Sequence, residues 1–148
     1  MNEADLIQYI TGSFPGVETT DNFGYKFFFV GPDRMRPFAS LANADYDYDR
    51  FSDLDRPGVY RLNMGVRRDS FERLFGASRV NVSEYDYTVL DRIMPHPEYA
   101  AQFFVCVLNP GEATLEAVKG LLAEAHEIAA QRHEKTRKDA HLPGEAEA

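Results

Sequence analysis

The sequence predicts an α+β fold in which an antiparallel β-sheet packs against an N-terminal helix and a long C-terminal helix. Short apolar segments separated by turn residues follow one another too closely for helical crossovers, so neighbouring strands should be antiparallel. Residues 102–108 are apolar on both alternating faces, as expected of a central strand covered on both sides. Residues 115–129 carry the apolar stripe of an amphipathic helix.

The chain should begin with a short helix. Asn2 and Asp5 have the spacing of a capping box, and apolar residues recur at helical intervals from Leu6 to Phe14. The dipeptide Pro15-Gly16 ends this pattern. Aromatic and β-branched residues then predict three strands, at residues 17–22, 24–30 and 38–43.

The next predicted strand covers residues 59–66, where two sets of residues alternate strictly. Its apolar set should face the core, and its other, mostly polar set should face outward. Arg61 and Asn63 then lie together on the open face of the sheet.

Two short helices are predicted in the second half of the chain. The first has Asp69 as its N-cap and ends at Gly76. The second covers residues 88–94, where Thr88 and Asp91 again have capping-box spacing.

The long helix near the C-terminus has its own start signal, with Asn109 as N-cap followed by a proline at the first helical position. Its apolar stripe makes it the expected lid on the sheet. Beyond His133 the periodicity is lost, so we expect a single domain over residues 1–133 and a charged, disordered tail over residues 134–148.

Length and composition limit the function classes. A chain of 148 residues with 44% hydrophobic residues is long enough for one self-supporting domain, which excludes disorder of the whole chain. The formal net charge of −8 opposes nucleic-acid binding. The acidic N-terminus lacks a secretory pattern and no apolar run could span a bilayer, so we expect a cytoplasmic protein without membrane association. The single cysteine, Cys106, lies in an apolar run and should be buried.

The order of these segments resembles an uncharacterised bacterial family of unknown function over about residues 4–133. The segments that carry the resemblance are Phe14-Pro15-Gly16, residues 51–58, residues 61–66, Met94-Pro95-His96-Pro97 and residues 104–110. This family is distantly similar to the MmcQ/YjbR-like superfamily, whose members also end in an apolar strand, a turn and a helix. The resemblance implies an antiparallel α+β fold and a superfamily label of DNA binding, and it brings no catalytic residues.

An acidic loop is the first candidate site. Hard cations prefer carboxylate oxygens, and metal binding through Asp45, Asp47 and Asp49 is one hypothesis. The loop does not follow the EF-hand pattern, because Arg50 and Arg56 occupy its sixth and twelfth positions. A solvated loop with internal aspartate–arginine pairs is the favoured interpretation.

His96 is the second candidate, because histidine exchanges protons near neutral pH and two prolines flank this one. The favoured alternative is a histidine that caps or packs at the end of the preceding helix. Arg61 and Asn63, with Arg56 and Asp53 from the preceding loop, are candidates for recognising an anion or an amide. The alternative for these residues is an ordinary wet sheet face.

These observations favour a non-enzymatic domain that binds a small ligand or a protein. The second hypothesis is an enzyme in which His96 and Asp53 or Asp55 form an acid–base pair, with Arg56 or Arg61 holding an anionic substrate. DNA binding, by analogy with the superfamily, ranks third. The familiar phosphate, nucleotide and metal motifs are missing from the sequence, so no cofactor is expected. A homodimer formed through a sheet edge is left open.

Overall fold

The computed structural model describes residues 1–32 and 36–147. Its centre is a six-stranded sheet of order β1-β2-β3-β4-β6-β5, in which every neighbouring pair is antiparallel. The strands are β1 (Val17–Asn22), β2 (Tyr25–Val30), β3 (Ala39–Ala42), β4 (Arg61–Gly65), β5 (Met94–Pro95) and β6 (Phe104–Leu108). The predicted α+β class with an antiparallel sheet is confirmed.

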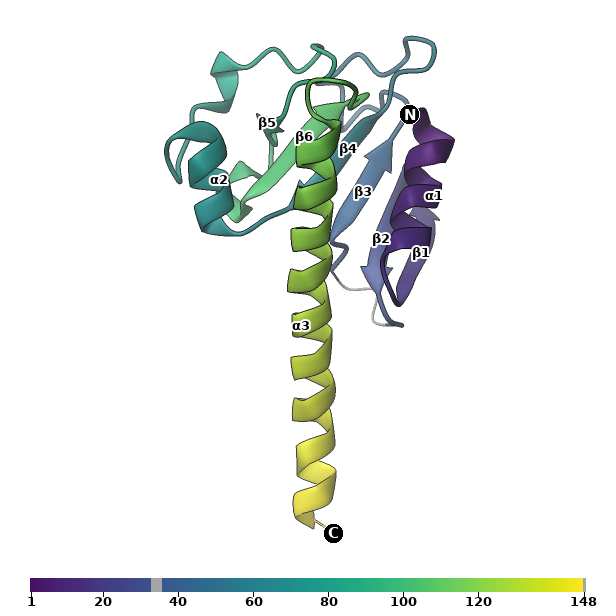
Figure 1. Ribbon diagram of the computed structural model, residues 1–148, viewed down its shortest axis with the longest axis vertical. Helices are drawn as coiled ribbons and strands as arrows, with labels where there is room; N and C mark the ends of the chain where they lie inside the picture. The colour runs from purple at the N-terminus through teal and green to yellow at the C-terminus, as the bar shows by residue number, and fades with distance from the viewer. Residues whose placement is uncertain (33–35, 148) are drawn as a thin grey trace.

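The main helices lie on one face of the sheet (Figure 1). They are α1 (Glu3–Ser13), which packs against β1, and α3 (Leu115–Glu147), which packs against β2 and β4. A shorter helix, α2 (Arg68–Phe75), contacts β5, and two 3₁₀ turns, η1 (Val82–Glu84) and η2 (Ala100–Gln102), lie in the connections around it. In the part of the chain described here, no helix has the length and apolar character that crossing a membrane requires.

The core forms between the sheet and these helices because alternate residues of each strand point to the same side. Leu41, Leu62 and Val107 are paired across β3, β4 and β6 and belong to one buried cluster with Leu6 of α1 and Leu122 of α3. A second apolar cluster on the other face joins Cys106 and Leu108 to residues of the loops. Strand β6 is therefore paired on both edges and covered on both faces, as predicted, but it begins at Phe104, because residue 102 ends η2 and Phe103 has a positive φ of 62°.

The predicted helix at residues 88–94 is wrong. The carboxylate of Asp86 accepts hydrogen bonds from both the backbone N–H and the hydroxyl of Thr88, which forms a turn where a helix cap was expected. Leu90 then bridges to Leu108, and Met94 enters strand β5. This segment thus pairs with the edge of β6 through its backbone, and this pairing overrides the local helical signals.

The predicted N-cap of α2 is also wrong. The helix begins at Arg68 with Arg67 as its N-cap, so Asp69 lies in the first turn. There the carboxylate of Asp69 accepts a hydrogen bond from the adjacent backbone N–H of Ser70. The predicted end at Gly76 is confirmed, since this residue is the left-handed C-cap.

The start of α3 differs from the prediction in a similar way. Asn109 has a positive φ of 44° and does not cap the helix, because its side chain bonds the backbone of Tyr60 and Gly58 instead. The helix begins at Leu115. The carboxylate of Asp91, distant in sequence, accepts hydrogen bonds from three backbone N–H groups just before it, those of Gly111, Ala113 and Thr114.

Replacing Asp91 with alanine should lower the free energy of unfolding by about 1–3 kcal/mol, because it leaves the N–H groups that precede α3 without their acceptor. Urea unfolding followed by circular dichroism measures this change. Asp69→Ala is the control, because its carboxylate accepts one adjacent backbone N–H at an exposed site. Equal effects of the two substitutions would contradict the capping role of Asp91.

Residues 134–147 continue α3 as helix past the edge of the sheet (Figure 1). The side chains of residues 134–138 are exposed. The division of the chain into a domain over residues 1–133 and a separate tail stays a prediction.

Candidate functional site

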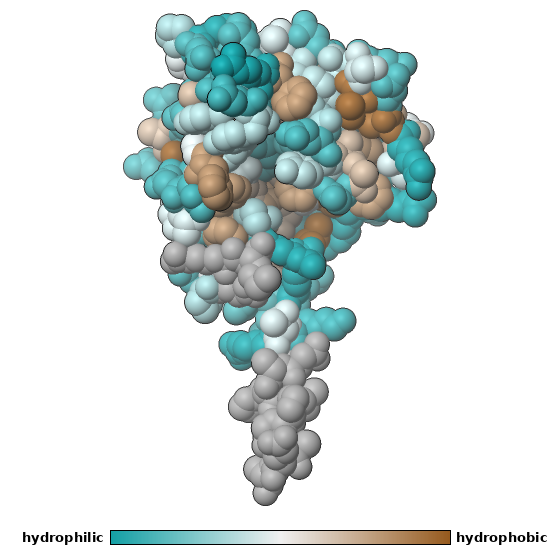
Figure 2. Space-filling view, turned by 180° about the vertical axis from the view of Figure 1, so that it is seen from behind, coloured by the Kyte–Doolittle hydropathy of each residue, from teal (hydrophilic) through white to brown (hydrophobic). Residues whose placement is uncertain are grey.

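A cavity of about 550 Å³ opens on the sheet face opposite α1 and α3. The strand register builds its floor, because Phe27, Ser40, Asn63 and Cys106 form one row across β2, β3, β4 and β6. Three of these four, all except Cys106, line the cavity. Figure 2 shows the molecule from behind the view of Figure 1, with apolar groups (brown) exposed at several places on that side.

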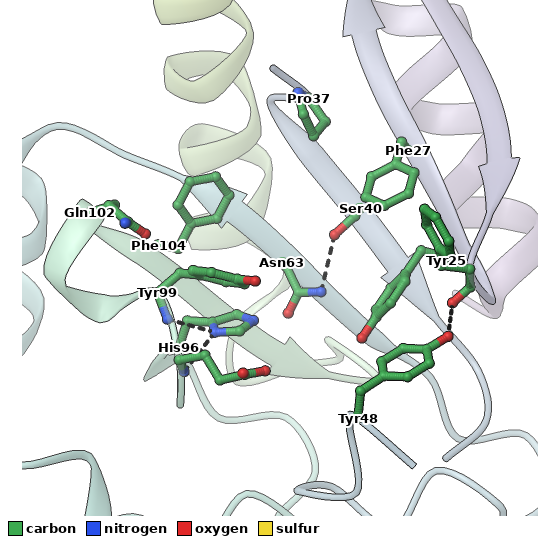
Figure 3. Close-up of a pocket in the computed structure, with 12 residues that line it drawn as sticks. Tyr25, Phe27, Pro37, Ser40, Tyr48, Asn63, His96, Tyr99, Gln102 and Phe104 are labelled. Carbon is green, nitrogen blue, oxygen red and sulfur yellow. Dashed lines mark hydrogen bonds between the residues drawn. The ribbon is translucent and has the colours of Figure 1, made fainter. Parts of the chain in front are cut away.

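Aromatic rings make the walls of this cavity. Tyr25 and Phe27 of β2 stand on one side, and Tyr99 and Phe104 stand on the other (Figure 3). Phe23, at the tip of the β1–β2 hairpin, lies at the rim and is 72% exposed. It also has a positive φ of 53°, which is uncommon for a bulky residue.

Two glycines allow this arrangement of rings. A Cβ atom on Gly65 would lie 3.1 Å from Cζ of Phe104, so a glycine lets that ring lie over β4. A Cβ atom on Gly24 would lie 2.2 Å from Cζ of Tyr46, and the φ of Gly24 is +81°. The hydroxyl of Tyr48 donates to the carbonyl of Phe23, so aromatic side chains of the 46–48 segment hold the hairpin tip.

The inner end of the cavity is polar. The Nδ2 group of Asn63 donates to Oγ of Ser40 at 3.1 Å, and Oδ1 of Asn63 accepts from Nε of Arg61 at 3.0 Å. Because arginine can only donate, its bond fixes which end of the Asn63 amide is oxygen. Asn63 and Ser40 therefore present one defined set of polar atoms to the cavity.

Arg61 lies beside Asn63 on the same sheet face, in a buried ion pair. Its guanidinium makes two bonds with the carboxylate of Asp49, with Nη1 donating to Oδ1 at 3.0 Å and Nη2 donating to Oδ2. Ser52 accepts a further bond from Nη1 at 3.2 Å, and the hydroxyl of Tyr25 donates to Asp49. Arg61 is 1% exposed, so the prediction of an open, wet sheet face at this position is wrong.

The ion pair sets the charges of its members. Burial alone would raise the pKa of Asp49, but the hydrogen bonds and charge of Arg61 outweigh burial and hold that pKa below its usual range. Burial and the bond to Asp49 raise the pKa of Tyr25, which stays protonated as a donor. The pair is therefore a neutral unit at neutral pH, and Arg61 has its charge already compensated.

His96 is buried and bonded on one side of its ring. Nδ1 accepts hydrogen bonds from the backbone N–H groups of Glu98 and Tyr99, at 3.0 and 3.1 Å. Burial, together with the charge of Arg61, lowers the pKa of His96 to about 3. Since Nδ1 accepts, the neutral ring carries its proton on Nε2, which points into the cavity (Figure 3). The histidine thus caps the turn that follows it, whereas the favoured interpretation placed it at the end of a preceding helix.

The structure does not bring the predicted acid–base partners together. Asp53 and Asp55 are exposed, and neither lines the cavity that His96 lines. Arg56 is held elsewhere, because its guanidinium donates to the backbone carbonyls of Ser52, Asp53 and Thr88. Of the predicted site residues, Asn63 and His96 line the cavity, and Arg61 is hydrogen bonded to Asn63 on the same sheet face.

The three aspartates of the metal hypothesis have separate partners. Asp49 pairs with Arg61, Asp47 pairs with Arg50 at 3.1 Å, and Asp45 accepts from the backbone N–H of Leu54. Across residues 1–32 and 36–147, the structure shows no group of three or more potential metal-ligating side chains placed to hold one ion.

Ser40 and the aromatic walls of the cavity were not predicted from the sequence. A signal was present in β2, where Tyr25, Phe27 and Phe29 alternate with the core residue Phe28. A strand with aromatic residues on both faces requires a second apolar surface opposite the core. Tyr99 and Phe104 come from distant segments that only the sheet pairing brings to the same place.

The chain matches a family model and is similar to a solved structure. A family model described as "Family of unknown function (DUF6194)" matches residues 1–138, and no curated protein matches the chain. A crystal structure of a protein from Pseudomonas syringae, Northeast Structural Genomics Consortium target PsR293, is similar with a TM-score of 0.57. The two chains are 14% identical, and the similarity covers 87% of this chain and 99% of that one. At this identity the likeness concerns the fold alone.

Proposed function

The chain belongs to the DUF6194 family of unknown function, and we propose from its site that it binds a small molecule in the cavity beside β4. One observation carries the proposal: a cavity of about 550 Å³ combines aromatic walls with a polar inner end formed by Ser40, Asn63 and His96. Its volume lies within the range of about 300–1,000 Å³ typical of ligand pockets, which are mostly apolar with a few placed polar groups.

The rim supports the same proposal. Phe23, Tyr48 and Tyr99 are all at least half exposed, and all three line the cavity. Exposed aromatic residues gathered around one concave surface favour a binding role, because each leaves apolar area in water that a ligand would cover.

The chemistry of His96 favours binding over acid–base catalysis. Its Nδ1 atom is occupied by backbone N–H groups, and a pKa of about 3 leaves the ring neutral at physiological pH. A general base needs a pKa near the working pH and an accessible acceptor atom. The cavity lining also contains neither lysine nor arginine among the described residues, and its charged member is Glu98, which disfavours binding of a nucleic-acid backbone there.

A thermal-shift screen of planar, ring-containing fragments tests this function. A fragment present at 100 times its Kd stabilises the folded state by about 2.7 kcal/mol, which raises Tm by several degrees. Hits should lose most of this shift in Tyr99→Ala, because the 50% exposed Tyr99 ring contributes to the cavity wall. The matched control is Phe51→Ala, which removes a 41% exposed ring outside the cavity lining.

The expected result is a set of fragments that stabilise the unmodified protein and Phe51→Ala equally and stabilise Tyr99→Ala much less. A screen of several hundred fragments without a hit, or hits that ignore the Tyr99 substitution, would count against binding in this cavity.

A further inference from the structure

We propose that the ligand is a neutral, planar ring compound held through a hydrogen-bond acceptor, such as a carbonyl oxygen attached to the ring. This inference rests on the proposed binding function and names the ligand class of the same cavity. It follows from the hydrogen-bonding capacity that remains at the polar inner end, from the charges around it and from the arrangement of the rings.

The polar inner end of the cavity has hydrogen-bond donors that are free to bind a ligand. Oγ of Ser40 accepts from Asn63, which leaves its own hydroxyl proton to donate. Asn63 uses one of its two N–H groups for Ser40, and its oxygen already accepts from Arg61. His96 has Nδ1 occupied by two backbone N–H groups and Nε2–H directed into the cavity. Three donors therefore face the cavity, whereas the oxygen atoms of Ser40 and Asn63 each already accept one hydrogen bond and Nδ1 of His96 accepts two.

The charges exclude an ionised ligand. A carboxylate taken into this cavity would lose its hydration, and full compensation requires a cation. The guanidinium of Arg61, next to Asn63, is already paired bidentately with Asp49, and His96 stays neutral. The charged group of the lining is the carboxylate of Glu98, which repels an anion. A cationic ligand would meet N–H and O–H donors at the inner end, and the carboxylate of Glu98, which could pair with it, is exposed to solvent. A neutral ligand with a hydrogen-bond acceptor avoids both the anionic and the cationic mismatch.

The walls favour a flat molecule. Tyr25 and Phe27 lie across the cavity from Tyr99 and Phe104, so each wall offers aromatic surface against which a planar ring can pack (Figure 3). The cavity volume of about 550 Å³ accommodates a fused two-ring compound together with a carbonyl group that reaches the donors.

Four naphthalene derivatives test this inference at pH 7.5 by titration with fluorescence detection. The probes are 2-naphthamide, 2-naphthoate, 2-naphthylmethylamine and 2-methylnaphthalene, which share the ring and differ in charge and in the acceptor. We expect 2-naphthamide to bind at least ten-fold more tightly than each of the other three. Ser40→Ala should weaken 2-naphthamide binding about ten-fold, because it removes one donor. Ser78→Ala, which removes a hydroxyl outside this cavity, should leave binding unchanged.

The four ligands keep the test decisive even if Ser40→Ala folds poorly, since three of the comparisons need only the unmodified protein. Binding of 2-naphthoate or 2-naphthylmethylamine more tightly than the amide, or equal binding of 2-methylnaphthalene, would overturn the inference and leave the binding function standing. If none of the four binds while other fragments raise Tm in the screen, the inference is again wrong and the function stands. If the screen is also empty, both fail.

Discussion

Asp49→Ala is expected to lower the free energy of unfolding by about 3–5 kcal/mol, because it leaves the guanidinium of Arg61 buried without its counter-charge. The hydroxyl of Tyr25 loses its acceptor in the same variant. Equilibrium urea unfolding measures the change. Asp47→Ala is the matched control, since its side chain is 97% exposed and pairs with Arg50 at the surface, where ion pairs contribute little.

A second variant distinguishes the stability lost because a charge is left unpaired from the stability lost because a contact is removed. The double substitution Asp49→Leu with Arg61→Met removes both charges, so it should recover much of the stability that Asp49→Ala loses. A single variant as stable as Asp47→Ala, or a double variant no more stable than the single one, would show that the ion pair is not the buried unit described above.

His96 should make stability strongly dependent on pH. Its pKa is lowered to about 3 in the folded protein, mainly by burial and secondly by the charge of Arg61, whereas an unfolded histidine has a pKa of about 6.5. Between these values the unfolded chain binds a proton that the folded chain does not, so stability falls as the pH decreases. The slope attributable to His96 approaches about 1.4 kcal/mol per pH unit between pH 6 and pH 4.

Comparing the unmodified protein with His96→Asn isolates this contribution. The asparagine oxygen can accept the backbone N–H of Glu98 as Nδ1 does, but it does not titrate. Asp49, whose pKa is held below its usual range, loses stability from about pH 5 downward in both proteins, so the difference between the two stability–pH curves isolates His96. Parallel stability–pH curves for the two proteins between pH 6 and pH 4 would contradict a buried neutral His96.

Hydrophobic periodicity was enough to predict most of the sheet. Residues 59–66 alternate between apolar and polar, and the run that ends at Leu108 is apolar on both alternating faces. Both patterns follow from the burial of a strand, and both segments contain strands of the sheet. The helix expected at residues 88–94 failed because Thr88 and Asp91 bond to groups outside that segment. Local capping signals cannot show that the backbone of this segment pairs with the edge of a strand instead of forming a helix.

The candidate site was predicted in part. The alternation correctly placed Arg61 and Asn63 on the face opposite the helices, but it could not show that this face is covered. Asp49, twelve residues before Arg61, lies among other aspartates that look equivalent in sequence, and its pairing depends on how the whole loop folds. The tautomer of His96 likewise depends on hydrogen bonds from two backbone N–H groups, and no pattern of side chains in the sequence predicts such bonds.

The cavity presents His96 as a neutral hydrogen-bond donor through Nε2. Nitrogen-15 NMR of the histidine rings, recorded from pH 5 to pH 8 with and without 2-naphthamide, tests it most directly. We expect the His96 ring to keep its proton on Nε2 and its bare nitrogen at Nδ1 throughout, with the Nε2 resonance shifting when the amide is added. A His96 ring that is doubly protonated at pH 5, that carries its proton on Nδ1, or that ignores a bound amide would contradict the account.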